Sequence, residues 1–138
     1  MMEEINEEEC KILKKLTNNY KTQIVIQEFL PDIYDGDFRV LIIHGEPYKK
    51  TLARIPQGGS FKGNLAAGGK GEIRDISDVQ MRIGSVVGEY LMKKDINFAG
   101  IDIIGQKLTE INITSPTCAR EIFEQSGMNP IEDYFKKL

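Results

Sequence analysis

The sequence predicts an α+β domain built on an antiparallel sheet of about five strands, with helices packed mainly on one face. Two observations predict this class. Segments with alternating or densely β-branched side chains are joined by short turn signals, which is typical of antiparallel hairpins. Other stretches repeat apolar residues every three or four positions, which is typical of helices. With 138 residues, the chain fits one modest domain, and we predict a single domain over residues 1–138.

The composition, with 41% hydrophobic and 28% charged residues and a formal net charge of −3, is that of a soluble globular protein. There is no basic excess that would indicate nucleic-acid binding. No apolar run approaches the length of a membrane span, and the acidic N-terminus differs from a signal peptide, so we expect a cytoplasmic protein. Cys10 and Cys118 lie far apart without metal-ligand spacing, which favours two reduced thiols.

The N-terminal part of the chain predicts a helix followed by a strand. Apolar residues recur at helical spacing over residues 3–18, with lysines on the remaining surface. The stretch Thr-Gln-Ile-Val-Ile-Gln at residues 22–27 is dense in β-branched side chains and predicts a strand. We expect this strand to end before Pro31, because proline disfavours continuation of regular structure.

Residues 37–43 and 48–55 predict the strands of a hairpin, with a turn at residues 44–47. Because side chains alternate between the two faces of a strand, Asp37 and Arg39 share one face. A cross-strand ion pair with a carboxylate is one interpretation of Arg39. His44 is the only histidine, and because no nucleophile is visibly paired with it, we interpret it as a turn residue.

Residues 55–72 are interpreted as a glycine-rich mobile loop, with six glycines between Ile55 and Gly71. Glycine permits left-handed backbone, and long irregular segments in a domain are usually lids, binding loops or disordered linkers. The apolar side chains of Ile55, Phe61 and Leu65 favour a binding loop over a plain linker.

Three helices are predicted after this loop. Ser77 and Gln80 fit a capping box at the start of a helix that runs to about Lys94, and glycines at positions 84 and 88 permit close approach to the sheet. Residues 118–125 predict a short helix, and Asn129-Pro130 begins the last one.

Residues 98–114 predict a second hairpin, which carries the candidate chemistry. A three-residue loop, Gly105-Gln106-Lys107, sets Asp102 opposite Glu110, whereas a two-residue loop would send Glu110 to the wrong face. One face then carries Asp102, Glu110 and Asn112. The other carries four isoleucines packed on a core, at positions 101, 103, 111 and 113. Two carboxylates and an amide oxygen suit Mg²⁺, although an ordinary half-exposed hairpin would show the same pattern.

Three motifs extend this interpretation: Leu52-Ala-Arg-Ile-Pro-Gln-Gly-Gly59, Gly63-Asn-Leu-Ala-Ala-Gly-Gly69 and Thr109-Glu-Ile-Asn-Ile-Thr-Ser-Pro-Thr117. In this order they closely resemble the prokaryotic glutathione synthetase family of ATP-grasp ligases, from about Gln27 to about Glu121. Only the C-terminal part of the family pattern is represented. The N-terminal substrate domain and the central subdomain with its nucleotide-binding lysines have no counterpart. The resemblance implies the fold of the C-terminal ATP-grasp subdomain.

The resemblance also implies roles for individual residues. Nucleotide binding is expected from Glu28, Phe29 and Leu30 through their backbone and from Asp37 near the ribose. Arg39 and Arg54 are expected to be catalytic, stabilising the transferring group. Substrate contacts are expected from Arg54, Asn64, Ser115 and Thr117, although Ser115 and Thr117 would also suit a simple helix N-cap. Metal binding is expected from Asp102, Glu110 and Asn112.

The activity implied by the resemblance is glutathione synthesis, in which ATP phosphorylates γ-glutamylcysteine and glycine displaces the phosphate. ATP and Mg²⁺, with Mn²⁺ as an alternative, are the implied cofactors. Because half of the nucleotide cleft is absent, we hypothesise that this polypeptide is inactive or nearly so alone, as a fragment or a half-enzyme. A homo-oligomer or a complementary chain would then be its partner. Two alternatives are another ATP-grasp carboxylate–amine ligase and a truncated, non-catalytic nucleotide-binding or assembly module.

Overall fold

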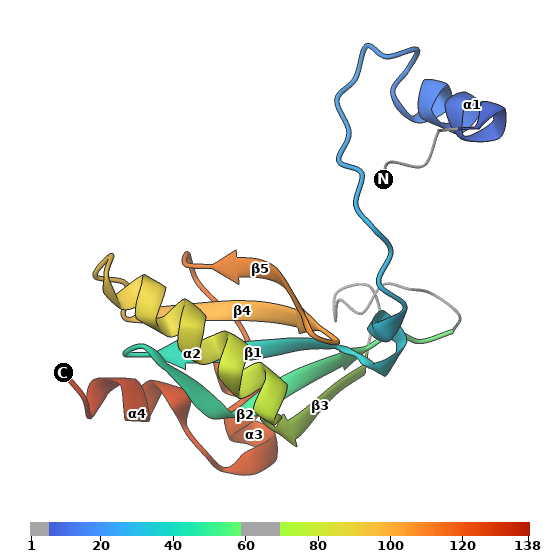
Figure 1. Cartoon of the computed structure of the whole chain (residues 1–138). Helices are drawn as coiled ribbons and strands as arrows, with labels where there is room; N and C mark the ends of the chain where they lie inside the picture. Colours follow the sequence, from blue (N-terminus) through green and yellow to red (C-terminus); the bar gives the residue numbers. More distant parts are fainter. Residues whose placement is uncertain (1–5, 59–69) are drawn as a thin grey trace.

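The structure, a computed structural model, describes residues 6–58 and 70–138 (Figure 1). Five antiparallel strands form one sheet in the order β3-β2-β1-β4-β5. The α+β class and the five-stranded sheet are confirmed. The elements along the chain are α1 (Glu7–Leu16), η1 (Pro31–Asp35), β1 (Asp37–Ile43), β2 (Glu46–Ile55), β3 (Lys70–Asp75), α2 (Asp78–Met92), β4 (Phe98–Ile104), β5 (Lys107–Asn112), α3 (Ala119–Ser126) and α4 (Pro130–Phe135).

One member of the sheet differs from the prediction. Residues 22–27 form no strand, and their apolar side chains lie open to solvent, with Val25 84% and Ile26 71% exposed. Lys70–Asp75 pairs with β2 instead and supplies the fifth strand. Its sequence holds a single β-branched apolar residue, Ile73, so local pattern gave no strand signal. The long strand β2 provides the backbone partner that makes the segment extended.

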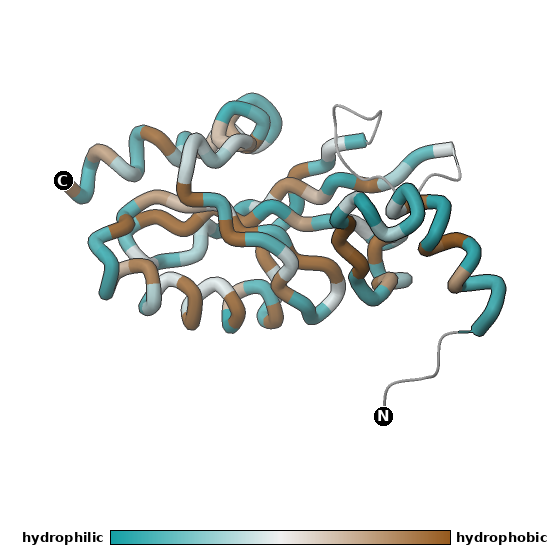
Figure 2. Tube along the Cα trace, turned by 90° about the horizontal axis from the view of Figure 1, so that it is seen from above, coloured by the Kyte–Doolittle hydropathy of each residue, from teal (hydrophilic) through white to brown (hydrophobic). Residues whose placement is uncertain are grey.

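The two faces of the sheet are both covered by helices, so the prediction that they pack mainly on one face was wrong. On one side, α2 contributes Val87 and Leu91 to a core with Val40, Ile42 and strand β4. On the other, Ile122 of α3 packs with Leu41, Ile43 and Tyr48. Figure 2 shows helices on both sides of the strands. The reason is the continuous apolar run in β1, which must be buried on both faces.

Helix α2 is anchored at its start and by close packing in its middle. The capping box is confirmed, since Ser77 Oγ accepts from the Gln80 backbone and the Gln80 side chain accepts from the Ser77 backbone. A Cβ at Gly88 would lie 1.9 Å from the carbonyl oxygen of Gly45, in the β1–β2 turn. The helix therefore rests directly on that turn, and the predicted close approach to the sheet is found at Gly84, where a Cβ would lie 2.7 Å from Cγ of Pro47 in β2.

The β1–β2 turn is shorter than expected because β2 begins at Glu46. His44 is confirmed as a turn residue, with a left-handed φ of 48°. Its ring stacks on Tyr134 of α4, with Nε2 3.0 Å from the Tyr134 carbonyl oxygen. The turn thus ties α4 to the sheet.

The chain ends differ in how they join this body. Helix α1 is capped by Asn6 and buries none of its residues, and Figure 1 shows it apart from the sheet. It stops at Leu16, two residues before the predicted end, and its predicted start at Glu3 lies outside the described residues. Helices α3 and α4 begin within one residue of their predicted positions.

No described helix combines the length and apolarity needed to cross a membrane.

Candidate functional site

The β4–β5 hairpin brings Asp102 opposite Glu110, as predicted, but by a different route. Ile104 pairs with Lys107, so the loop has two residues and the three-residue loop was wrong. An irregularity between Asp102 and Ile103 leaves Thr109 as an extra residue on β5, and this bulge restores the pairing. The Thr109 hydroxyl donates to the Asp102 carbonyl at 3.1 Å, which holds the bulge in place.

The turn itself requires glycine at its first position. Gly105 has a φ of 56°, and a Cβ there would lie 2.2 Å from Oδ2 of Asp32 in η1. The short turn η1 therefore packs directly on the hairpin. This contact helps to place the preceding segment beside β4 and β5.

The hairpin is less covered than predicted. Ile101 and Ile103 lie in the core, but Ile111 and Ile113 are 39% and 51% exposed, so their predicted core packing was wrong. The cause is the position of β5 at the sheet edge, beyond the strands β1 and β4 that α2 covers.

Arg39 and Asp102 are directly opposite on β1 and β4, and they form a buried two-point ion pair. Arg39 Nε donates to Oδ1 of Asp102, and Nη2 donates to Oδ2 at 2.7 Å. The cross-strand ion pair considered for Arg39 is thus present, but in the interior, since the two side chains are only 5% and 6% exposed. A planar guanidinium suits a carboxylate in this fork geometry.

Arg54 joins the same site from β2. Its Nη2 lies 2.9 Å from Oδ2 of Asp102 and 2.5 Å from Oδ2 of Asp37, the residue opposite it on β1. Three neighbouring strands therefore carry one cluster of two arginines and two aspartates, which we call the ion-pair cluster: Asp37, Arg39, Arg54 and Asp102.

The side chain of Arg39 is enclosed by its surroundings. A Cβ at Gly100 would lie 3.0 Å from Arg39 Cδ and 3.0 Å from Pro116 Cβ, so glycine leaves the room that the arginine occupies. The remaining nitrogen, Nη1, donates to Oγ1 of Thr117 at 3.4 Å. All three guanidinium nitrogens of Arg39 therefore have protein acceptors.

Arg54 and Asp37 keep unused hydrogen-bonding atoms. Within the described residues, Nε of Arg54 and Oδ1 of Asp37 are buried without a hydrogen-bond partner. Buried polar atoms are normally satisfied, so this donor and this acceptor are available to a bound molecule.

The two aspartates of the cluster respond oppositely to their surroundings. Burial alone would raise the pKa of Asp102, but hydrogen bonds from Arg39 and the charge of Arg54 outweigh it and lower that pKa. For Asp37, burial dominates and raises the pKa, although Arg54 partly offsets it. Burial also raises the pKa of the Cys118 thiol, which keeps it neutral beside Thr117.

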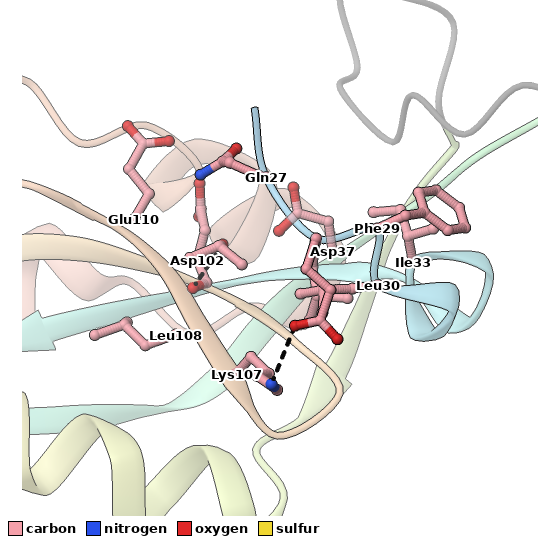
Figure 3. A pocket seen from close by; sticks show the side chains of 12 residues that line it. Gln27, Phe29, Leu30, Ile33, Asp37, Asp102, Lys107, Leu108 and Glu110 are labelled. Carbon is pink, nitrogen blue, oxygen red and sulfur yellow. Dashed lines mark hydrogen bonds and ion pairs between the residues drawn. The ribbon is translucent and has the colours of Figure 1, made fainter. Parts of the chain in front are cut away.

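A pocket of about 630 Å³ opens next to the ion-pair cluster (Figure 3). It is formed by the segment before η1, the start of β1 and the β4–β5 hairpin. The four residues predicted to bind nucleotide, Glu28, Phe29, Leu30 and Asp37, all line it. Asp102 and Glu110, two of the three residues predicted to bind metal, line it as well. Segments far apart in the sequence are thus brought to one cavity.

Several lining residues were not predicted. Ile33, Ile104 and Leu108 give the pocket apolar surface, and Gln27, Lys107 and Thr109 add polar groups. Lys107 Nζ lies 3.6 Å from Oε2 of Glu28, so it links the hairpin to the opposite side of the pocket. The position of Lys107 and Leu108 beside the predicted metal ligands was a usable signal, whereas nothing local indicated Ile33.

Three further predicted site residues, Asn112, Ser115 and Thr117, are not among those that line the pocket, and Thr117 contacts the cluster through Arg39. Asn112 is opposite Gly100 at the end of β5, and its Oδ1 accepts from the Thr114 backbone at 3.2 Å. Ser115 and Thr117 are exposed, and neither caps α3, because Cys118 stands at the N-cap and no side chain caps it. The simple N-cap alternative for these two hydroxyls was therefore wrong.

Part of the predicted loop can be placed. Ile55 ends β2, and residues 70–72 belong to β3, while residues 59–69 and with them Asn64 lie outside the described residues.

The oxygen donors at the hairpin are of the type that hard cations prefer, but the arginines already occupy the oxygens of one of them, Asp102. Carboxylate and amide oxygens are the usual ligands of such ions. The Glu110 side chain is exposed, whereas both oxygens of Asp102 accept from arginines. Over residues 6–58 and 70–138, no group of three or more His, Cys, Asp or Glu side chains is arranged to hold a metal ion.

Comparison with known proteins identifies the family. The family model for the ATP-grasp domain of prokaryotic glutathione synthetase matches residues 2–127. Glutathione synthetases of Xanthomonas campestris and Pseudomonas syringae are 48% and 51% identical over 118 residues, which are 86% of this chain and 37% of each relative. That of Vibrio parahaemolyticus is 51% identical over 111 residues, 80% of this chain and 35% of the relative.

The chain spans little more than a third of the length of these curated relatives. The matched region nevertheless includes the whole sheet, the ion-pair cluster and the pocket beside it. With this match over most of its residues, the chain belongs to the prokaryotic glutathione synthetase family, as part of the ATP-grasp domain.

Proposed function

We propose that this chain is the C-terminal, nucleotide- and metal-binding part of a glutathione synthase. That enzyme joins γ-glutamylcysteine to glycine at the expense of ATP, through an acyl phosphate. The observation that carries the proposal is the pocket that gathers Glu28, Phe29, Leu30 and Asp37 beside Asp102 and Glu110. The names of the relatives, glutathione synthetases at 48–51% identity, support the choice of reaction.

For the nucleotide, we assign the pocket surfaces by chemistry. The apolar side chains of Leu30, Ile33 and Ile104 suit a flat base, and residues 28–30 line the same pocket, where we place the polar edge of the base. The unpartnered Oδ1 of Asp37 suits a ribose hydroxyl, which can donate to it. For the phosphates we propose Arg39 and Arg54, whose charges Asp37 and Asp102 balance in the structure; among the described residues the buried Nε of Arg54 has no partner, so it can donate to a phosphate oxygen.

For the metal, the ATP-grasp family uses ATP together with a divalent cation, and we propose Mg²⁺, with Mn²⁺ as the alternative. Asp102, Glu110 and Asn112 would hold it. Such a cation offsets the negative charge of the phosphates during transfer. The protein's own contribution is to place the carboxylates on a bulged hairpin whose register is fixed by Thr109 and Gly105.

For the acid and amine substrates, we retain Asn64, Ser115 and Thr117 with Arg54 as contacts. The exposed hydroxyls of Ser115 and Thr117 support this, because no helix cap uses them and Thr117 touches Arg39. We also propose a cytoplasmic location and low activity of this polypeptide alone. A complementary chain or a second copy would supply the other half of the cleft, and the exposed Val25 and Ile26 support such a contact.

Calorimetric titration of ADP with Mg²⁺ into the purified chain tests the proposal. We expect saturable binding that weakens at least about tenfold in Glu110→Gln, because one charged metal ligand is lost. Glu89→Gln is the matched control, since Glu89 is an exposed carboxylate on α2 away from the pocket. Absence of ADP binding to the wild-type chain, or equal loss in both variants, would contradict the nucleotide site.

A further inference from the structure

The ion-pair cluster is electrically balanced. Asp37 and Asp102 carry two negative charges, and Arg39 and Arg54 carry two positive charges, with side chains between 5% and 20% exposed. Asp102 therefore offers an approaching cation no uncompensated charge, and two guanidiniums would repel that cation at short range. Three other carboxylates line the pocket beside Asp37. Asp102 belongs to the cluster, whereas Glu28 and Glu110 are exposed outside it, and Glu28 lies 3.6 Å from Lys107 Nζ.

The two arginines hold Asp102 in unequal ways. Arg39 makes a two-point contact, and Gly100, Pro116 and Thr117 enclose it. Arg54 reaches Asp102 through one nitrogen, Nη2, which it shares with Asp37, and its buried Nε has no partner among the described residues. Arg54 would therefore break fewer contacts than Arg39 if it turned toward another anion.

We propose that Arg54 prevents Asp102 from binding a metal ion until a phosphate group binds Arg54 in place of Asp102. Without phosphate, both arginines form ion pairs with Asp102, as in the structure. Phosphate oxygens match the guanidinium fork and satisfy the unused Nε, so a phosphate competes effectively for Arg54. Oδ2 of Asp102 then loses one donor and one adjacent positive charge, and the site can accept a cation. Metal binding thus becomes conditional on phosphate.

Asp37 is a positioning residue for Arg54. It lies opposite Arg54 on the neighbouring strand and accepts from the same Nη2 that contacts Asp102. Through this contact it keeps Arg54 beside Asp102 when no phosphate is present. The inference rests on the assignment of Asp102 as a metal ligand in the proposed function.

The test measures Mn²⁺ binding to the whole chain by electron paramagnetic resonance, without nucleotide. We expect weak binding by the wild type and about tenfold tighter binding by Arg54→Met, because a positive charge next to Asp102 is removed. The gain should vanish in Arg54→Met/Asp102→Asn. Arg120→Met is the matched control, since it removes an exposed arginine on α3 and should leave Mn²⁺ binding unchanged.

A second variant and a second ligand keep the test independent of folding. Arg54→Lys retains the charge but lacks the fork, so it should bind Mn²⁺ as weakly as the wild type. Inorganic phosphate should tighten Mn²⁺ binding to the wild type, and should change Arg54→Met and Arg54→Lys much less. Circular dichroism confirms that each variant is folded.

The outcomes separate this inference from the proposed function. If the wild type binds Mn²⁺ as tightly as Arg54→Met without phosphate, this role of Arg54 is overturned while the metal assignment stands. If Arg54→Met binds no Mn²⁺, or if its gain persists with Asp102→Asn, the metal assignment at Asp102 falls as well.

Discussion

Asp37 and Asp102 share Arg54, yet their energetic roles differ. Asp102 is 4% exposed and accepts hydrogen bonds from two arginines. Without its negative charge, these two guanidiniums would repel each other. Asp37 is half-buried, its one ion pair with a described residue is that with Arg54, and burial raises its pKa. The cluster is therefore organised around Asp102, whereas Asp37 tunes the position of Arg54.

At the residue scale, we predict that Asp102→Asn lowers the free energy of unfolding by about 3–5 kcal/mol, because two buried guanidiniums lose their common counter-charge. Asp37→Asn should cost about 1 kcal/mol or less, since its charged form already bears a burial penalty. Urea unfolding at neutral pH measures both. Equal costs for the two substitutions would contradict the central place of Asp102.

The lowered pKa of Asp102 predicts a specific pH dependence. A carboxyl with a depressed folded-state pKa contributes stability that is present above its ordinary value of 3.8 and lost as pH falls through the folded value. The difference in stability between wild type and Asp102→Asn should therefore be constant near neutrality and shrink below pH 3.8. Unfolding curves collected from pH 7 downward would check this, and a difference that begins to shrink well above that pH would contradict it.

At the scale of elements, glycines set how closely α2 and the hairpins approach their neighbours. Gly88 and Gly45 meet backbone to backbone, and Gly105 meets the side chain of Asp32. These contacts explain why α2 lies on the β1–β2 turn and why η1 lies on the β4–β5 turn. Both turns in turn position the strands that carry the ion-pair cluster.

We predict that Gly88→Ala destabilises the protein by about 1–3 kcal/mol, because the new Cβ overlaps the Gly45 carbonyl and α2 must shift. This loss should exceed the gain of up to about 1 kcal/mol that alanine brings to a helix interior. Ser85→Ala on the same helix is the control, since the Ser85 hydroxyl donates to the Met81 carbonyl within the helix. Thermal unfolding gives the comparison, and a stabilised Gly88→Ala would refute the close contact.

At the scale of the whole molecule, the sheet and its helices form one packed body, while the segment before η1 exposes apolar side chains. Ile24, Val25 and Ile26 are 37%, 84% and 71% exposed, and they precede the pocket residues Gln27 to Leu30. We expect such an exposed apolar stretch beside a pocket to contact another chain.

We predict that Val25→Asp reduces concentration-dependent association of the chain, because it places a charge in this apolar stretch. The free energy of unfolding should change by less than about 0.5 kcal/mol, since Val25 contributes little to the core. Val86→Asp, an exposed valine on α2, is the matched control. Sedimentation velocity over a range of concentrations measures the effect, and equal behaviour of the two variants would contradict it.

The sequence by itself determined the features that depend on neighbours along the chain. Alternation within β5 placed Glu110 and Asn112 on one face, and capping residues marked the starts of α2 and α4. The family motifs indicated Glu28, Phe29 and Leu30 and the two arginines as candidate site residues, and the structure brings the first three to one pocket. These features follow from side-chain periodicity and local hydrogen bonds, so they can be predicted without knowledge of the fold.

Only the tertiary structure decided which distant segments meet. It replaced residues 22–27 by Lys70–Asp75 in the sheet, covered both faces with helices and restored the hairpin register through a bulge. It also brought Arg39 and Arg54 onto Asp102, which turns an expected metal ligand into the centre of an ion-pair cluster. The reason is that strand partners and buried charge pairs are selected by contacts between residues remote in sequence, whose energies no local pattern contains.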